Sequence, residues 1–209
     1  MFASVTGIVL GVLLGLRHAF EPDHLTAVST LVIEANSARR GALLGAIWGI
    51  GHTVSLVAVG TVLVVTGAVL PERAAVGFEL GVAAMLVVLG VRALVTAHRY
   101  HVHPERVRAT GTTTALRPLV VGLVHGLAGS GAIAALVFAE LPTTAQRITY
   151  ISLFGLGSIA GMATASGVAG LSLRALAPTA NRRRVFGIVT GGLSITVGIA
   201  WAIPQLVLL

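Results

Sequence analysis

Residues 15–28 read GLRHAFEPDHLTAV, and this stretch decides what kind of helical protein the chain forms. It places His18, Asp23 and His24 inside a segment that is otherwise apolar on both sides. Ionisable side chains at bilayer depth are costly to retain, and they usually mark the path of an ion or a proton. We therefore take this stretch as the candidate functional site.

The composition predicts an integral membrane protein of the all-α class. Of the 209 residues, 56% are hydrophobic and only 10% are charged, and the mean hydropathy is +0.95. Six apolar segments are each long enough for a helix across a hydrocarbon core of about 30 Å. They are residues 2–35, which the polar stretch interrupts, and then 42–70, 74–97, 118–139, 148–173 and 185–206.

The distribution of basic residues predicts the orientation of these spans. All fourteen basic residues are arginine, and ten of them lie in the connections after the first, third and fifth spans. Only Arg73 and Arg147 lie in connections on the other side. Since cytoplasmic loops carry the excess of basic residues, both termini are expected to be extracytoplasmic in a bacterial-type cytoplasmic (inner) membrane. The net charge of +7 is then a signal of topology and does not indicate nucleic-acid binding.

The two halves of the chain resemble each other. Gly15 and His18 match Gly122 and His125 at an offset of 107 residues, and glycines in the later spans match at offsets of 106 and 108. Because three spans is an odd number, the second copy must be inverted in the membrane, as in many secondary transporters. We predict one transmembrane transporter domain over 1–209, with repeat one over 1–97, a basic cytoplasmic loop over 98–117 and repeat two over 118–209.

The spacing of the polar stretch predicts that the first helix is broken at the motif. On a straight helix, His18, Asp23 and His24 would not share one face. Pro22 has no amide hydrogen, so it is expected to release the carbonyl of His18 and break the span there. Residues Arg17 and Glu21 lie four positions apart and are expected to pair with each other.

Three histidines, from the first, second and fourth spans, lie at similar depth. Counted from the basic loops, His24, His52 and His125 each lie about 12–17 Å into the bilayer. We expect them to converge near the midplane, although a packing role for His125 is an equal alternative. Thr53 is expected to bond helix to helix, and Ser130 lies in a glycine-rich stretch that favours exposure of its backbone to a cavity.

The donor set favours a divalent transition metal. Neutral imidazole and carboxylate suit Ni²⁺, Co²⁺, Zn²⁺ and Mn²⁺, whereas Cu(I) prefers sulfur. The chain has no cysteine, so disulfides and thiolate metal sites are excluded. The residues predicted as metal ligands are His18, Asp23, His24, His52 and His125.

Two motifs of the chain resemble those of the nickel/cobalt transporter (NiCoT) family. His18, four residues and then Asp23-His24 resemble its H-x4-D-H signature, and Gly51-His52-Thr53 resembles its second motif. The resemblance implies a nickel or cobalt permease in which His18, Asp23 and His24 select the metal and His52 accompanies them.

The fourth span resembles one branch of that family. Residues 124–131, VHGLAGSG, stand where most members carry a Gly-Phe-Asp motif, and Glu21-Pro22 replaces the more usual Asp-Ala. This pattern is similar to the short, six-span branch that includes urease-accessory membrane proteins of the UreH type.

The expected function is a secondary transporter that takes up Ni²⁺ or Co²⁺, not an enzyme. The metal is its substrate and no prosthetic group is expected; the partners are the lipid bilayer and a cytoplasmic metal-receiving protein, with no nucleic acid. The alternatives are metal efflux, export of another solute by a related fold, a haem electron carrier, and an intramembrane zinc-dependent hydrolase. The hydrolase would use the same donors, but the H-E-x-x-H motif does not occur.

Overall fold

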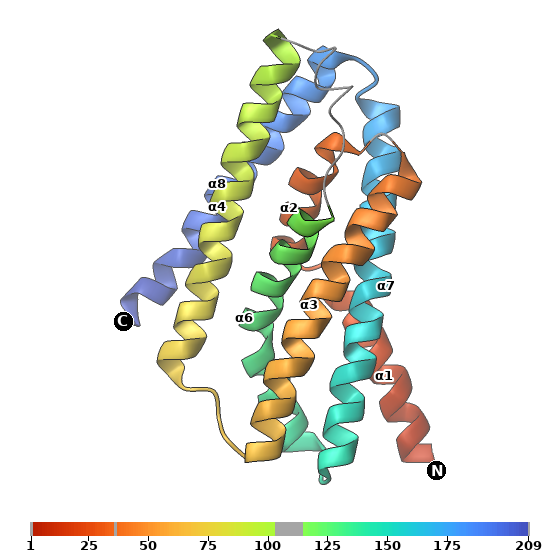
Figure 1. The fold of residues 1–209 in the computed structure, drawn as a ribbon, viewed down its shortest axis with the longest axis vertical. Coiled ribbons are helices and arrows are strands. Elements are labelled where there is room, and N and C mark those ends of the chain that lie inside the picture. Colours follow the sequence, from red (N-terminus) through yellow and green to blue (C-terminus); the bar gives the residue numbers. More distant parts are fainter. Residues whose placement is uncertain (1, 36, 103–114, 209) are drawn as a thin grey trace.

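A computed structural model describes residues 2–35, 37–102 and 115–208 of the chain (Figure 1). Arg106 and Arg108 of the predicted basic loop lie outside the described residues, and the side chain of Ser130 is not among those described. The helices are α1 (Phe2–His18), α2 (Pro22–Leu31), α3 (Ala38–Thr66), α4 (Glu72–Val102), α6 (Leu116–Glu140), α7 (Thr144–Leu176) and α8 (Ala180–Val207), with a 3₁₀ turn at Val32–Glu34 after α2.

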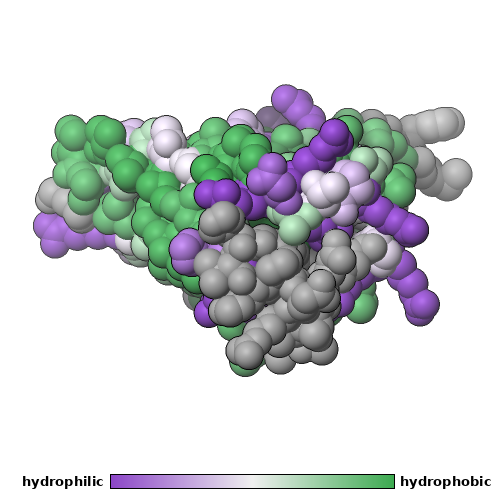
Figure 2. All heavy atoms as spheres, turned by 90° about the horizontal axis from the view of Figure 1, so that it is seen from above, coloured by the Kyte–Doolittle hydropathy of each residue, from purple (hydrophilic) through white to green (hydrophobic). Residues whose placement is uncertain are grey.

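The predicted all-helical membrane class is confirmed for the described part of the chain. Four helices, α3, α4, α7 and α8, are long and apolar enough to cross a membrane, while α1 and α6 contribute the shorter apolar segments Val9–His18 and Leu116–Gly129. Large apolar side chains point outward, such as Val62 and Val65 of α3, which are 60% and 66% exposed. In Figure 2, green hydrophobic residues cover the flank that reaches to the left, over α4 and α8. Such a surface suits lipid.

The helices pack in pairs, of which α3 with α7 and α4 with α8 are antiparallel, whereas α6 with α3 and α1 with α7 are parallel. Helix α3 lies along α7, α4 lies along α8, α6 packs against α3, and α1 packs against α7 (Figure 1). At the top of Figure 1, α3 begins, α4 and α7 end, and α8 begins. We call this the basic end, because six described arginines lie in these turns: Arg39, Arg40, Arg174, Arg182, Arg183 and Arg184. Helix α1 begins and α8 ends in the lower half, toward the opposite end.

The first span is broken between His18 and Pro22. The amide of Glu21 donates to the carbonyl of His18 at 3.0 Å, so this carbonyl is not left free as expected from the sequence. Pro22 takes the first position of α2, where its missing N–H costs nothing, and the preceding residue Glu21 is extended. The proline therefore restarts the chain as a new helix, α2, which presents Asp23 and His24 in its first turn.

Glycines set the closest helix contacts, and the contacts come in related pairs. A Cβ added at Gly15 of α1 would overlap the carbonyl oxygen of Phe154 in α7, and one added at Gly122 of α6 would overlap the carbonyl oxygen of Trp48 in α3. The two contacts are related by offsets of 107 and 106 residues. The same relation holds for Gly51 on Leu119 with Gly157 on Val12, and for Gly90 on Gly191 with Gly198 on Ala83.

Thr53 joins the two long central helices. Its Oγ1 donates to the carbonyl oxygen of Gly155 in α7 at 2.9 Å, in addition to the packing between the helices. We expect Thr53→Val to lower the free energy of unfolding by about 1 kcal/mol, because hydrogen bonds between membrane helices are worth about that much. Thermal unfolding in detergent measures this change. Thr164→Val is the control, since the Thr164 hydroxyl is exposed and bonds only within α7; equal effects of the two substitutions would contradict the prediction.

Candidate metal centre

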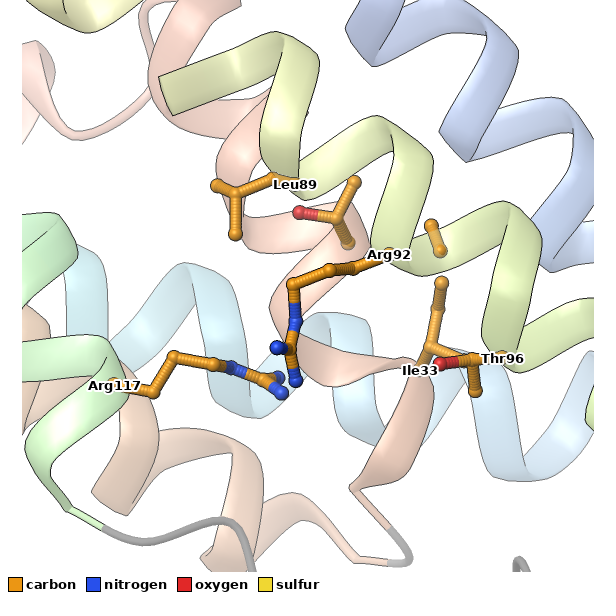
Figure 3. Close-up of a pocket in the computed structure, with 7 residues that line it drawn as sticks. Ile33, Leu89, Arg92, Thr96 and Arg117 are labelled. Carbon is orange, nitrogen blue, oxygen red and sulfur yellow. The ribbon is translucent and has the colours of Figure 1, made fainter. Parts of the chain in front are cut away.

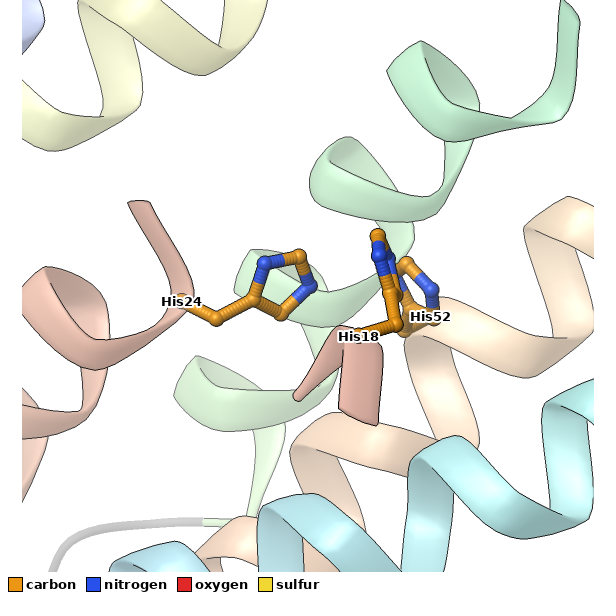
Figure 4. A group of neighbouring side chains, drawn as sticks. All are labelled: His18, His24 and His52. Carbon is orange, nitrogen blue, oxygen red and sulfur yellow. The ribbon is translucent and has the colours of Figure 1, made fainter. Parts of the chain in front are cut away.

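The break in the first span brings the predicted ligands together. His18 ends α1, Asp23 and His24 open α2, His52 comes from the middle of α3, and His125 comes from α6. The ring centroid of His24 lies 4.4 Å from that of His18, 5.5 Å from that of His52 and 4.0 Å from that of His125. Figure 4 shows the rings of His18, His24 and His52 converging from their separate helices. All five side chains named from the sequence thus lie in one cluster.

The cluster offers two overlapping groups of donors. His18, His24 and His52 form one group, and Asp23, His24 and His125 form the other, with the donor atoms of each group within 4.8 Å of one another. An ion bound at about 2.1 Å from each donor keeps the donors at most about 4.2 Å apart. Small side-chain rotations are therefore enough to close either group around an ion, and His24 belongs to both.

The Asp23 carboxylate ties the second group together. One of its oxygens accepts from His125 Nε2 at 2.7 Å, and the other lies 3.2 Å from His24 Nδ1. Asp23 is itself only 7% exposed, so this carboxylate is stabilised by imidazole groups and not by bulk water. The arrangement holds two histidines at fixed positions around one acidic group.

Several ring nitrogens of the cluster have no hydrogen-bond partner among the described residues. They are His18 Nε2, His24 Nε2, His125 Nδ1 and both nitrogens of His52, which is completely buried. A buried polar atom without a partner costs free energy, and such atoms are rare in folded proteins. A neutral imidazole has a lone pair on one of its two nitrogens. Because each of these four histidines can offer such a lone pair toward the cluster, a metal ion is a partner that suits them.

Two aromatic side chains pack against the cluster. The Trp48 ring lies 5.5 Å from the His24 ring and 5.9 Å from the His125 ring, and Phe154 lies 5.3 Å from His18, all between centroids. These contacts restrict the rotation of the imidazoles and shield them from water on one side. Trp48 is fully buried and therefore also provides a fluorescent reporter next to the candidate metal site.

Glu21 and Arg17, which are expected from the sequence to pair with each other, have different surroundings in the structure. Glu21 Oε2 lies 3.0 Å from His18 Nδ1, so Glu21 partners the histidine and not Arg17 as expected. The separation of α1 from α2 is the physical reason, because the two residues no longer sit on one continuous helix. Arg17 instead lies on the wall of a cavity beside the cluster.

This cavity has a volume of about 450 Å³ and reaches the cluster from one side. Its wall includes His18, Asp23, His24 and His125, and it continues past residues on those halves of α4, α6, α7 and α8 that lie toward the end opposite the basic end. These residues are Glu79, Ile133, Leu136, Tyr150 and Trp201. The cluster is thus reached from the opposite end.

On the basic side of the cluster, the described residues line a small cavity of about 10 Å³ between α2, α4 and α6. Figure 3 shows Arg92 and Arg117 on its wall, with their guanidinium groups facing each other. Apolar side chains including Val28, Leu86 and Val121 belong to the core cluster that fills this side of the bundle. A cation on this side would meet close packing and two arginine side chains.

Sequence reasoning did not single out Glu79, Trp48 or Trp201. For Glu79 a signal existed, because it is a carboxylate within the apolar segment predicted over 74–97, and such residues mark functional sites by default. For the tryptophans no signal existed, since an aromatic residue in an apolar span is ordinary core or lipid-facing surface.

Comparison with known proteins gives one related chain to report. Over 201 residues the protein is 30% identical to the urease accessory protein UreH of Bacillus sp. (strain TB-90), and the match covers 92% of this chain and 88% of the relative. No family model matches the chain, and no solved structure matches it.

Proposed function

Since the chain belongs to the family of UreH-type urease accessory proteins, we propose that it is a secondary transporter that moves Ni²⁺ or Co²⁺ across the membrane. The membership confirms the resemblance found in the sequence motifs. The name of the relative connects it to urease, which supports nickel as the metal and delivery for urease maturation as the purpose. A cytoplasmic metal-receiving protein is the corresponding partner.

The observation that carries this proposal is the pair of donor groups that share His24. Together they provide imidazole and carboxylate donors, which suit Ni²⁺ and Co²⁺. Unpartnered nitrogens in both groups give an arriving ion binding partners that the protein alone does not satisfy. Two overlapping groups also allow an ion to pass from one set of ligands to the next without becoming fully free, as reversible transport requires.

We further propose six spans arranged as two inverted repeats. The related glycine contacts support this, because a two-fold axis in the membrane plane would exchange the contact of Gly15 on Phe154 with that of Gly122 on Trp48. Rocking of one repeat against the other would then expose the cluster alternately to each side.

The cavity supports access to the cluster from the extracytoplasmic side, which the proposed uptake requires. It runs from the cluster toward the end opposite the basic end, and basic loops face the cytoplasm in membrane proteins. In this orientation both termini would lie outside, and the cluster would be accessible from the extracytoplasmic side of the inner membrane. An ion captured there would leave toward the basic end after the repeats rock.

Accumulation of radiolabelled Ni²⁺ in cells that express the chain tests the proposal. We expect accumulation above the vector control for the unchanged protein and background levels for His18→Ala and Asp23→Asn, compared at equal membrane amounts. Lower accumulation than the control, restored by the substitutions, would instead indicate efflux. No change in any variant, for either Ni²⁺ or Co²⁺, would contradict the proposal and direct attention to the hydrolase alternative.

Binding can be followed separately from transport. The chain has two tryptophans, so Trp201→Phe leaves Trp48, beside His24 and His125, as the only indole. We expect Ni²⁺ and Co²⁺ to quench its fluorescence saturably, with no saturable quenching after Asp23→Asn. Mg²⁺, which prefers oxygen donors, is the control ion, and equal quenching by Mg²⁺ would contradict a nitrogen-rich site.

A further inference from the structure

Glu79 is an acidic residue on the cavity wall that the metal cluster does not use. It lies on α4, seven residues after the helix begins at the end opposite the basic end, which is about 10 Å along the axis. The cavity that it lines is the one that contains Asp23 and His24. Glu79 therefore faces the same space as the cluster but from a different helix.

A single hydrogen bond fixes the Glu79 carboxylate. Trp201 Nε1 of α8 donates to Glu79 Oε2 at 2.7 Å. The other oxygen, Oε1, accepts no hydrogen bond from the described residues. The indole thus orients the carboxylate while one oxygen stays available to a ligand in the cavity.

The wall of this cavity also includes the apolar side chains Val82, Ile133 and Leu136 and the exposed, positively charged Arg17. The carboxylate of Glu21 lies on the wall too, but it is already paired with His18 Nδ1 at 3.0 Å. A divalent ion that approaches the cluster loses bulk water in such a passage, and a carboxylate is the group that best offsets this loss. Glu79 is the acidic group that α4 contributes to this wall.

Glu79 has no acidic counterpart in the second half of the chain. At the offset of 108 residues that relates α4 to α8, its counterpart is Gly187, which carries no side chain. The carboxylate thus belongs to the outer approach alone, whereas helix-packing glycines such as Gly90 and Gly198 occur in both halves.

We propose that Glu79 is a capture residue, which binds the hydrated divalent cation in the outer part of the cavity and passes it to Asp23 and His24. This inference rests on the proposed function and deepens it by adding a binding step before the cluster. Trp201 is the positioning residue that holds Glu79 in the orientation needed for capture.

The test is the concentration dependence of Ni²⁺ uptake by Glu79→Gln, a substitution that keeps shape and removes charge. We expect KM to rise about tenfold, because one sign of charge in a cleft raises the association rate by at least that factor, while the maximal rate stays within about twofold. Glu79→Asp is expected to stay near the unchanged protein. Trp201→Phe is expected to raise KM by a smaller factor, and high salt should weaken uptake by the unchanged protein more than uptake by Glu79→Gln.

Glu72→Gln is the matched control. Glu72 lies in the first turn of the same helix, is exposed and does not line the cavity. Equal KM values for Glu79→Gln and Glu72→Gln, with active uptake by the unchanged protein, would overturn the capture role and leave the proposed function standing.

Equilibrium dialysis with ⁶³Ni²⁺ in detergent separates capture from damage to the cluster. We expect Glu79→Gln to keep its Kd within about twofold of the unchanged protein. A loss of affinity as large as the rise in KM would assign Glu79 to the structure of the cluster and overturn the capture role. Absence of both binding and uptake in the unchanged protein would overturn the proposed function together with this inference.

Discussion

Replacement of His24 by alanine is expected to abolish Ni²⁺ binding, with the largest loss of affinity of any single substitution in the cluster. His24 belongs to both donor groups, and its ring centroid lies within 5.5 Å of those of all three other histidines. Its removal leaves two members in each group and takes away a partner of Asp23. Residues that only orient ligands already cost about 10–100-fold in affinity when removed, so we expect a loss of about 100-fold or more for this shared ligand.

Equilibrium dialysis of the purified protein measures this loss, and His98→Ala is the matched control. His98 is an exposed histidine of α4 near the basic end, and it is not part of the cluster. We expect His98→Ala to bind as the unchanged protein does, and His125→Ala to bind with an intermediate affinity because it breaks only the second group. An affinity of His24→Ala equal to that of His98→Ala would refute the metal assignment of the cluster.

The break in the first span shows how far local sequence reasoning reaches. Pro22 predicts the break, because the missing N–H and the restricted preceding residue act within a few positions of the chain. The predicted pairing of Arg17 with Glu21 is wrong, because it assumes that one continuous helix crosses the break that Pro22 creates. Once α2 starts anew, Glu21 lies beside His18 and Arg17 faces the cavity.

The composition of the cluster could be predicted, but its surroundings could not. Imidazoles and a carboxylate in apolar spans are conspicuous, and helix rise alone places His24, His52 and His125 at similar depths. Which face of each helix points inward depends on packing between distant segments, so the contact of Trp48 with the rings and that of Trp201 with Glu79 appear only in three dimensions. The periodicity of apolar residues does not show which face of a helix points inward here, because a membrane helix is apolar on every face.

Substitution of Gly122 by alanine is expected to cause the largest loss of stability. A Cβ at this position would overlap the carbonyl oxygen of Trp48 and approach the amide nitrogen of His52, and both are backbone atoms that no side-chain rotation can move. Overpacking typically costs about 1–3 kcal/mol, and we expect a value at the upper end because α6 and α3 must separate. For a chain of this length, that corresponds to a fall in Tm of roughly 6–12 °C.

The same measurement on two further variants tests the proposed repeat as well as the packing. At Gly15 the overlap would be with the carbonyl oxygen of Phe154 and is related to that at Gly122 by the repeat, so Gly15→Ala should lower Tm by a similar amount. At Gly192 of α8 an added Cβ meets no described atom within 4 Å, so Gly192→Ala should leave Tm unchanged or raise it slightly through its better helix propensity. Equal Tm values for all three variants would show that glycine packing does not hold the helices together. A large fall for Gly122→Ala without one for Gly15→Ala would instead separate the two halves energetically and argue against a symmetric role of the repeats.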